Sequence, residues 1–244
     1  FLSEVASTTA SAYALPVPRI FGLFLNVKEA PALGDIDVRR ALAYAIDRTE
    51  IAERASGGVI PDDTFLPHAL SKQRRHASFA YPFDPDRARA LLEDAGWKDN
   101  DGDGILEKKL STAKNATATP LRLTVATSDW IDLVEAANLI KNMLRPAGID
   151  IAIEQFPFAE LESAVIRPRK YQLLLFGHAY GYELDPFAFW HSSQIKDPGL
   201  NVSLYANKKA DALLEAIRKT RDPVALSAHY AALQTLIEED LPAI

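Results

Sequence analysis

Apolar and polar residues follow one another along this chain in blocks that predict strands and helices in alternation. Four apolar runs are typical of strands, namely 20–26, 121–127, 149–156 and 171–177. Between the last three, apolar residues spaced three and four apart predict a long helix from about 133 to 144, and a short helix is expected at about 158–166. Strand–helix–strand–helix–strand order is typical of right-handed crossovers. We therefore expect an α/β fold with a mixed, mostly parallel sheet flanked by helices.

Capping residues predict where several other helices begin. Asp35 or Asp37 precedes a helix whose buried face is spaced like one side of an amphipathic helix, and Asp47 precedes a short one. Asp84 stands before a proline, which suits the first turn of a helix, and Asn207 begins the first of two helices near the end. The Ala/Ser/Thr-rich stretch 1–19 is interpreted as a connector.

Composition and motifs narrow the function classes. The chain has 244 residues, of which 48% are hydrophobic and 25% charged, so it can form a substantial core without a disulfide or a metal. It has no cysteine, which excludes thiol catalysis and Cys-ligated zinc. A net charge of −6 argues against a nucleic-acid partner. Nucleotide-binding loops, serine-hydrolase elbows and zinc-protease helices are absent from the sequence, so no cofactor is expected.

An acidic turn at 99–104 leaves two interpretations open. Asp99, Asp101 and Asp103 occupy positions 1, 3 and 5 of a calcium loop, and a glycine follows at position 6. Position 12 falls on Leu110, where such a loop needs a bidentate glutamate, although Glu107 stands at position 9. The other interpretation is a hairpin turn, because Asp–Gly pairs adopt positive φ at low cost.

The segment 176–191 is the strongest candidate for a ligand site. It follows a predicted buried strand, and open α/β sheets bind ligands at the carboxyl ends of their strands. It combines two glycines, several aromatic residues and the carboxylates Glu183 and Asp185. Aromatic walls with a carboxylate suit a ligand that has an apolar body and a cationic amine. The same segment fits two alternatives: a hydrolase that uses the two carboxylates, and a docking module with a flat aromatic surface.

Ordered motifs resemble the family 5 extracellular solute-binding proteins. The motifs are FLNVKEAPALGDIDVRRALAYAIDRTEI (24–51), YPFDPDRARALLEDAGWKDNDGDG (81–104), LRPAGIDIAIEQF (144–156), YQLLLFGHAYGYELDP (171–186), LNVSLYANKKADALLEA (200–216) and EEDLPAI (238–244). The resemblance implies a type II periplasmic-binding-protein lobe that binds peptides, nickel complexes or sugars for an ABC importer. It further implies a location outside the cytoplasm, a permease partner, and residues 20–244 as a carboxy-terminal lobe whose amino-terminal partner lobe is missing.

The resemblance also implies roles for single residues. Asp185, with Glu183 beside it, matches the acidic position that holds a peptide's amino group, and Phe158 matches an aromatic that lines the pocket. The stretch 129–138 has no arginine, which departs from the dipeptide binders. The expected ligand-binding residues are Asp185, Glu183, Phe158, Gly177, His178, Tyr180, Tyr182 and Trp190.

Overall fold

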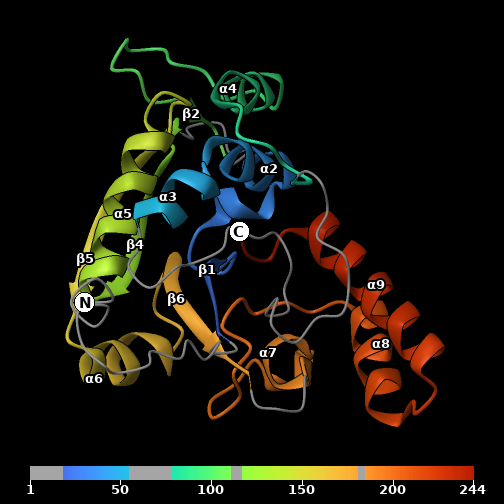
Figure 1. The fold of residues 1–244 in the computed structure, drawn as a ribbon. Helices are drawn as coiled ribbons and strands as arrows, with labels where there is room; N and C mark the ends of the chain where they lie inside the picture. Colours follow the sequence, from blue (N-terminus) through green and yellow to red (C-terminus); the bar gives the residue numbers. More distant parts are fainter. Residues whose placement is uncertain (1–18, 55–78, 111–116, 181–184) are drawn as a thin grey trace, which may run out of the picture.

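The computed structural model describes residues 19–54, 79–110, 117–180 and 185–244 (Figure 1). Its strands are β1 (Arg19–Leu25), β2 (Glu107–Lys108), β3 (Thr119–Pro120), β4 (Arg122–Ser128), β5 (Asp150–Phe156) and β6 (Leu173–Ala179). Its helices are η1 (Pro31–Gly34), α2 (Ile36–Ala45), α3 (Arg48–Arg54), α4 (Pro85–Asp94), α5 (Ile131–Leu144), α6 (Phe158–Glu160), η2 (Leu161–Ile166), α7 (Phe187–Trp190), η3 (Ser192–Gln194), α8 (Lys208–Lys219) and α9 (Pro223–Asp240). Among these helices, none combines the length and apolar character that a membrane span requires.

The main sheet has the strand order β1-β6-β4-β5. β4 is parallel to both β5 and β6, whereas β1 is antiparallel to β6. This arrangement confirms the expected mixed, mostly parallel sheet. The antiparallel pairing brings Arg19, at the start of β1, opposite Ala179, at the end of β6. In Figure 1 the arrow of β6 points toward the bottom of the view, where α6 and α7 lie.

Alternate residues of the strands face two separate cores, as the pleat of a strand requires. On β6, Leu173 and Leu175 belong to one core, and Leu174 between them belongs to the other. The first core is completed by α2, α4 and α5, and the second by η2, α7, α8 and α9. The sheet is therefore the middle of three layers, and its carboxyl end lies between two sets of helices.

Local capping explains most helix starts. The Asp84 side chain accepts a hydrogen bond from the amide of Arg87 at the start of α4, and Asn207 accepts from the amides of Lys209 and Ala210 at the start of α8. Asp35, the first of the two residues proposed for α2, accepts from the amide of Asp37. Of the predicted connector 1–19, all but Arg19 lies outside the described residues, and Arg19 is the first residue of β1.

Candidate functional site

The carboxyl ends of β4, β5 and β6 lie along one edge of the sheet because these strands are parallel. Residues that can face a ligand follow two of these strands. Asp129 and Trp130 come directly after β4, and Phe158 comes shortly after β5. The start of β1 joins the same edge through its antiparallel pairing with β6. This edge is where open α/β sheets bind their ligands.

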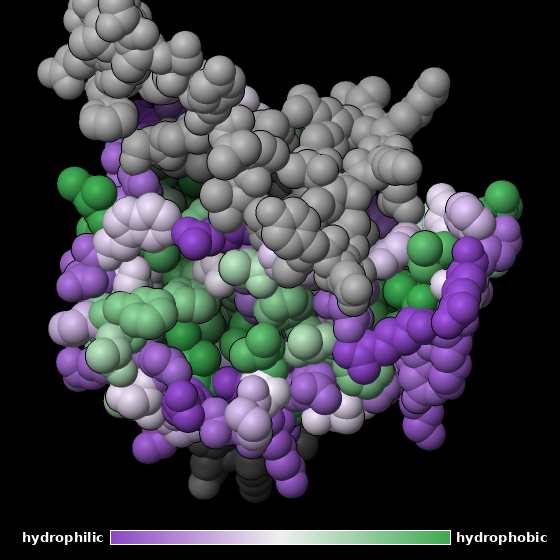
Figure 2. Space-filling model, turned by 60° about the horizontal axis from the view of Figure 1, so that its bottom comes forward, coloured by the Kyte–Doolittle hydropathy of each residue, from purple (hydrophilic) through white to green (hydrophobic). Residues whose placement is uncertain are grey.

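Exposed aromatic side chains gather at this edge. Trp130 is 44% exposed and Phe158 is 59% exposed, which are high values for side chains of this size. The ring of Trp130 lies 5.6 Å from that of Phe21 on β1, and the ring of Phe158 stacks on Phe176 of β6 with centres 6.1 Å apart. Figure 2, which turns this end of the molecule forward, shows an apolar area bordered by polar side chains.

Gly177 allows Phe21 to lie across β6. A β-carbon at this position would stand 2.8 and 2.9 Å from two ring carbons of Phe21, and 3.4 Å from Cδ of Arg19. Real side chains do not approach this closely, so any larger residue would displace the Phe21 ring. The sequence predicted that Gly177 belongs to the site. In the structure Gly177 lies beneath the Phe21 ring and leaves room for it.

Three other residues expected at the site have the surroundings of core residues. His178, Tyr180 and Trp190 are each only 4–6% exposed and belong to, or pack within, the second core. The imidazole of His178 lies between the rings of Phe24 and Phe189, each with its centre 4.4 Å away. These side chains pack the layer beneath the edge, and contact with a ligand would require that layer to open.

Burial sets the ionisation of these groups. It lowers the pKa of His178 to about 3, since a charged imidazole would lose its hydration among apolar rings. It raises the pKa of the Tyr180 hydroxyl for the same reason, although the indole N–H of Trp190 donates to that hydroxyl at 3.2 Å and opposes the shift. Both groups are therefore neutral near pH 7.

The carboxylate of Asp185 already has partners on both oxygens. Oδ1 accepts from the amide of Phe187 at 3.1 Å, so Asp185 supports the start of α7. Oδ2 accepts from Nε and a terminal nitrogen of Arg218 at 2.9 and 2.5 Å, and this guanidinium also lies 3.6 Å from the centre of the Phe187 ring. An amine would have to compete with Arg218 for this carboxylate. Glu183 and Tyr182 lie outside the described residues.

The acidic turn is a hairpin-like turn whose carboxylates bind backbone amides. Lys98 and Glu107 exchange two backbone hydrogen bonds across its base, which confirms the turn interpretation. Asp99 accepts from the amides of Gly102 and Gly104 at 2.7 and 3.0 Å.

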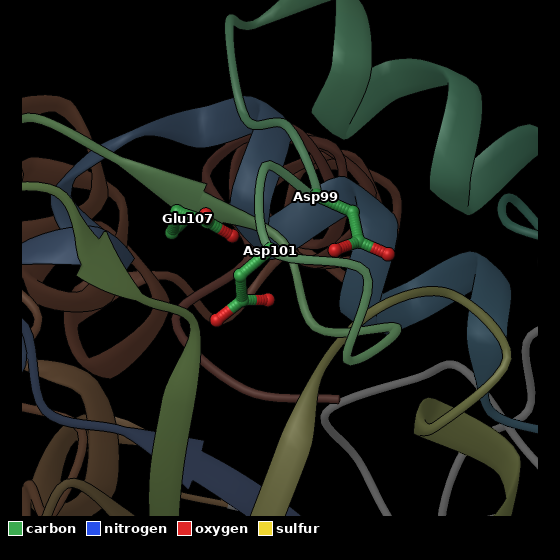
Figure 3. Close-up of side chains that lie close together, drawn as sticks. All are labelled: Asp99, Asp101 and Glu107. Carbon is green, nitrogen blue, oxygen red and sulfur yellow. The ribbon is translucent and has the colours of Figure 1, made fainter.

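The carboxylates that lie together at this turn differ from the predicted set. Carboxylate oxygens of Asp99, Asp101 and Glu107 lie within 4.8 Å of one another, as Figure 3 shows. Asp103 instead pairs with Arg122 at 2.9 Å. Calcium binding by Asp99, Asp101 and Asp103 stays a prediction from the sequence.

Phe21 and Trp130 are the site residues that sequence reasoning missed. Asp129 and Trp130 directly follow the strand predicted at 121–127, so the strand-end rule applied to segment 176–191 also selects them. Phe21 gave no such signal. Its place depends on the antiparallel pairing of β1 with β6, which links distant parts of the chain.

Comparison with known protein families shows which family this chain belongs to. The family model described as bacterial extracellular solute-binding proteins, family 5 Middle, matches residues 5–217, which is most of the sequence. The chain belongs to this family. Its family 5 relatives include the oligopeptide-binding protein AppA of Bacillus subtilis, 28% identical over 222 residues that cover 85% of this chain and 37% of AppA. The nickel-binding periplasmic protein of Escherichia coli is 29% identical over 226 residues, covering 89% of this chain and 40% of that protein.

Solved structures of the family share the fold. AppA from Bacillus subtilis in complex with a nonapeptide superimposes with a TM-score of 0.80 at 24% identity, covering 93% of this chain and 44% of that one. An oligopeptide-binding protein from Thermotoga maritima with bound mannohexaose gives a TM-score of 0.77 at 22% identity, covering 94% and 44%. The chain thus has the α/β fold of type II periplasmic binding proteins, and it spans about 40% of the length of the curated relatives it matches.

Proposed function

We propose that this chain forms one wall of the ligand cleft of an extracytoplasmic solute-binding protein that delivers peptides or similar solutes to an ABC importer. The observation that carries this proposal is the exposure of two aromatic side chains at the carboxyl ends of parallel strands: Trp130, which lies against the half-buried Phe21, and Phe158, which stacks on the half-buried Phe176. Large apolar side chains in contact with water are typical of surfaces that another molecule covers.

Peptide-like ligands are favoured over other solutes. The relatives are named for different solutes: oligopeptides, nickel and glutathione. One of the solved structures holds mannohexaose. Flat aromatic faces can accept the apolar side chains and planar amides of a peptide, and they also stack on sugar rings. AppA, named as an oligopeptide-binding protein, matches this chain both in sequence and in fold, and this supports the peptide class.

We further propose that residues 20–244 form one lobe, that 1–19 lead into it, and that the opposite wall belongs to a second lobe. The support is that the relatives are more than twice as long as the part this chain matches. Closure of two lobes over a solute would create the form that a permease recognises. An isolated wall should hold its ligand weakly, because half of the contacts are absent.

Mass spectrometry of solutes that co-purify with the protein, expressed over its full reading frame, tests the proposed function directly. A peptide or similar solute released on denaturation supports it. A protein that carries no solute and binds nothing from a peptide library would overturn it.

A Trp130→Ala variant tests whether the aromatic surface is the binding surface. Covering an exposed aromatic ring contributes roughly 1.5–3 kcal/mol, so we expect about ten- to hundredfold weaker binding of the captured solute by calorimetry. Phe83→Ala is the matched control, because Phe83 is 46% exposed at the start of the α4 region. Equal affinity for the Trp130 variant and the parent would place the site elsewhere.

The hydrolase alternative gains no support from Asp185, whose oxygens bind Arg218 and a backbone amide. The family is one of solute-binding proteins. We therefore propose binding without catalysis. A panel of esterase, peptidase and glycosidase substrates checks this proposal, since turnover above background would favour the hydrolase.

A further inference from the structure

The net charge of this chain is concentrated at the carboxyl ends of β4 and β5. We define the acidic tip as residues 128–135, which end β4 and begin α5, together with 154–162, which end β5 and run through α6 into η2. These seventeen residues include no lysine, arginine or histidine, and they hold six carboxylates: Asp129, Asp132, Glu135, Glu154, Glu160 and Glu162. Of the 33 acidic residues in the chain, the other 27 equal the 27 Lys and Arg residues in number. The tip therefore accounts for the whole net charge of −6.

A backbone hydrogen bond joins the two segments of the acidic tip. The amide of Asp129 donates to the carbonyl of Phe156 at 2.9 Å, and Ser128 pairs with Phe156 in the parallel register of β4 and β5. Figure 1 shows α5, β5 and α6 on the same side of the molecule. The carboxylates of both segments thus lie at one end of the β4–β5 pair.

Most carboxylates of the tip are not neutralised by a partner. Glu162 pairs with Arg167 at 2.7 Å. Four others are exposed and have no ion pair or side-chain hydrogen bond with another described residue: Asp129, Glu135, Glu154 and Glu160. Glu160 stands in the first turn of α6, where a carboxylate also stabilises a helix N-terminus. Glu135 lies past the first turn of α5 and Glu154 lies within β5, so helix ends do not account for these two.

The cations that flank the tip along the chain stand at a distance from it. Arg122 begins β4, six residues before Ser128, which is about 20 Å along an extended strand. Lys141 follows Asp132 on α5 by nine residues, about 13 Å along the helix axis. Both distances exceed the Debye length of about 8 Å at physiological ionic strength. Arg19 lies against Phe21 on β1, with β6 between β1 and the tip. The tip therefore keeps a negative potential.

Large apolar side chains are exposed among these carboxylates. Trp130, Ile131 and Phe158 are 44%, 74% and 59% exposed. They stand beside the acids in the sequence, since Asp129 precedes Trp130 and Glu160 follows Phe158 by two residues. A lysine or arginine side chain has an apolar stem and a cationic head, and the head is attracted both to carboxylates and to the face of an aromatic ring. A surface that combines the two features suits such a side chain better than a neutral one.

We propose that the acidic tip selects peptides that carry lysine or arginine side chains, with the stem on Trp130 or Phe158 and the charged head among the carboxylates. This inference rests on the proposed function and deepens it, because it names the kind of side chain that the exposed aromatic residues prefer. It concerns the side chains of the ligand and makes no use of its two ends.

Calorimetry with three pentapeptides tests the tip in the protein expressed over its full reading frame. The probes are Ala-Lys-Ala-Lys-Ala, Ala-Gln-Ala-Gln-Ala and Ala-Glu-Ala-Glu-Ala, whose ends are identical, so differences in affinity report on the side chains. The lysine probe should bind about tenfold more tightly than the glutamine probe, and the glutamate probe should bind least. Raising KCl from about 20 to about 500 mM should reduce the preference for lysine, since salt screens exposed charges.

A double variant assigns the preference to the tip. Asp129→Asn with Glu154→Gln removes two of its unpaired carboxylates with little change of shape, and should lose most of the preference for lysine over glutamine. The matched control is Glu53→Gln with Glu239→Gln, which removes two exposed acids on α3 and α9 and changes the net charge by the same amount. The control should keep the parent's preference.

The outcomes separate this inference from the proposed function. Equal affinity of the parent for the lysine and glutamine probes would overturn the inference, and so would an unchanged preference in the tip variant or an equal loss in the control. If the probes still bind and lose affinity in the Trp130→Ala variant, the proposed function stands without the charge preference. Failure of every peptide, together with the absence of a co-purified solute, would overturn the proposed function itself.

Discussion

His178 shows how burial decides the role of a residue. Its position after the strand predicted at 171–177 suggested a ligand contact, yet its side chain faces the second core. Its ring lies between Phe24 and Phe189, and Nε2 has no hydrogen-bond partner among the described residues. An imidazole in these surroundings resists protonation, which gives the folded protein a specific sensitivity to acid.

We predict that His178 lowers the stability of the protein as pH falls below about 6.5. Burial lowers the pKa of His178 to about 3 in the folded state, whereas an unfolded histidine titrates near 6.5. Between these values the unfolded chain binds a proton that the folded protein does not, so the free energy of unfolding decreases with falling pH. The contribution is about 1.4 kcal/mol per pH unit at most. Urea denaturation from pH 7.5 to 4 measures it.

His178→Phe should remove this part of the pH dependence, because a phenyl ring fits among the aromatic neighbours and does not titrate. Phe189→Leu is the control, since it perturbs the same packing and keeps the histidine, so its stability curve should be lowered in parallel with the parent's. If the His178→Phe and parent curves have the same slope between pH 6 and 4, His178 does not titrate as its burial requires.

At the scale of elements, α8 and α9 are joined by polar side chains at their far ends. Asn207 caps α8 through its side-chain oxygen, and its Nδ2 donates to Oδ2 of Asp240 at the end of α9, at 2.8 Å. The hydroxyl of Tyr205 donates to the same oxygen at 2.7 Å, and Nε of Arg39 on α2 donates to the Asp240 carbonyl at 3.0 Å. This group of bonds fixes the last helix to the rest of the molecule.

We predict that Asn207→Ala lowers the free energy of unfolding by about 1–3 kcal/mol, because it removes both the cap and the bond to Asp240. Asn207→Ser keeps a capping hydroxyl and loses the reach to Asp240, so it should cost less. Asp222→Ala removes a cap alone, at the start of α9. Chemical denaturation compares the three variants. Equal losses for Asn207→Ala and Asp222→Ala would show that the Asp240 bond adds nothing.

Local signals account for what the sequence predicts well at this scale. The starts of α4 and α8 were predicted because Asp84 and Asn207 act on amides only two or three residues away. The two-residue strands β2 and β3 were missed, since each is too short to give a pattern and they pair with each other across the intervening residues 109–118. Helix α7 was also missed, because it is one turn of aromatic residues within a segment interpreted as a ligand loop.

At the scale of the whole molecule, the order of the strands is what the sequence left open. Three parallel strands followed from alternating elements, but nothing local places β1 beside β6 and antiparallel to it. The candidate site depends on this pairing, because it brings Arg19 and Phe21 to the edge where Trp130 and Phe158 emerge. The segment 176–191 was therefore correctly placed at the end of a strand, while three of the four aromatic side chains at this edge, Phe21, Trp130 and Phe158, come from elsewhere in the chain.

The last residues of the chain complete the sheet from its other side. The amide of Leu23 donates to the carbonyl of Ile244 at 2.8 Å, and the amide of Ile244 donates to the carbonyl of Leu23 at 3.0 Å. Ala243 pairs with Phe24 in an antiparallel bridge, and the amide of Leu25 donates to the carbonyl of Pro242. β1 is thus bonded on both sides over its second half, by β6 and by this segment.

We predict that Ile244→Pro destabilises the protein by about 1–3 kcal/mol more than Ile244→Ala. Proline has no N–H to donate to Leu23, and this carbonyl lies in the middle of β1, where a lost partner is not readily replaced by water. The residue before a proline favours extended backbone, so the bridge of Ala243 with Phe24 should persist and the loss should be confined to the two bonds between Ile244 and Leu23. Ile244→Ala controls for the half-buried side chain, which packs on the first core.

Denaturation gives the difference in stability between the two variants, and hydrogen exchange at the amides of Leu23 and Leu25 shows where bonds are lost. Faster exchange at Leu23 in the proline variant supports the pairing. Equal stability and equal exchange in both variants would mean that β1 is held by β6 alone, and Arg19 and Phe21 would then owe their place at the edge only to that one pairing.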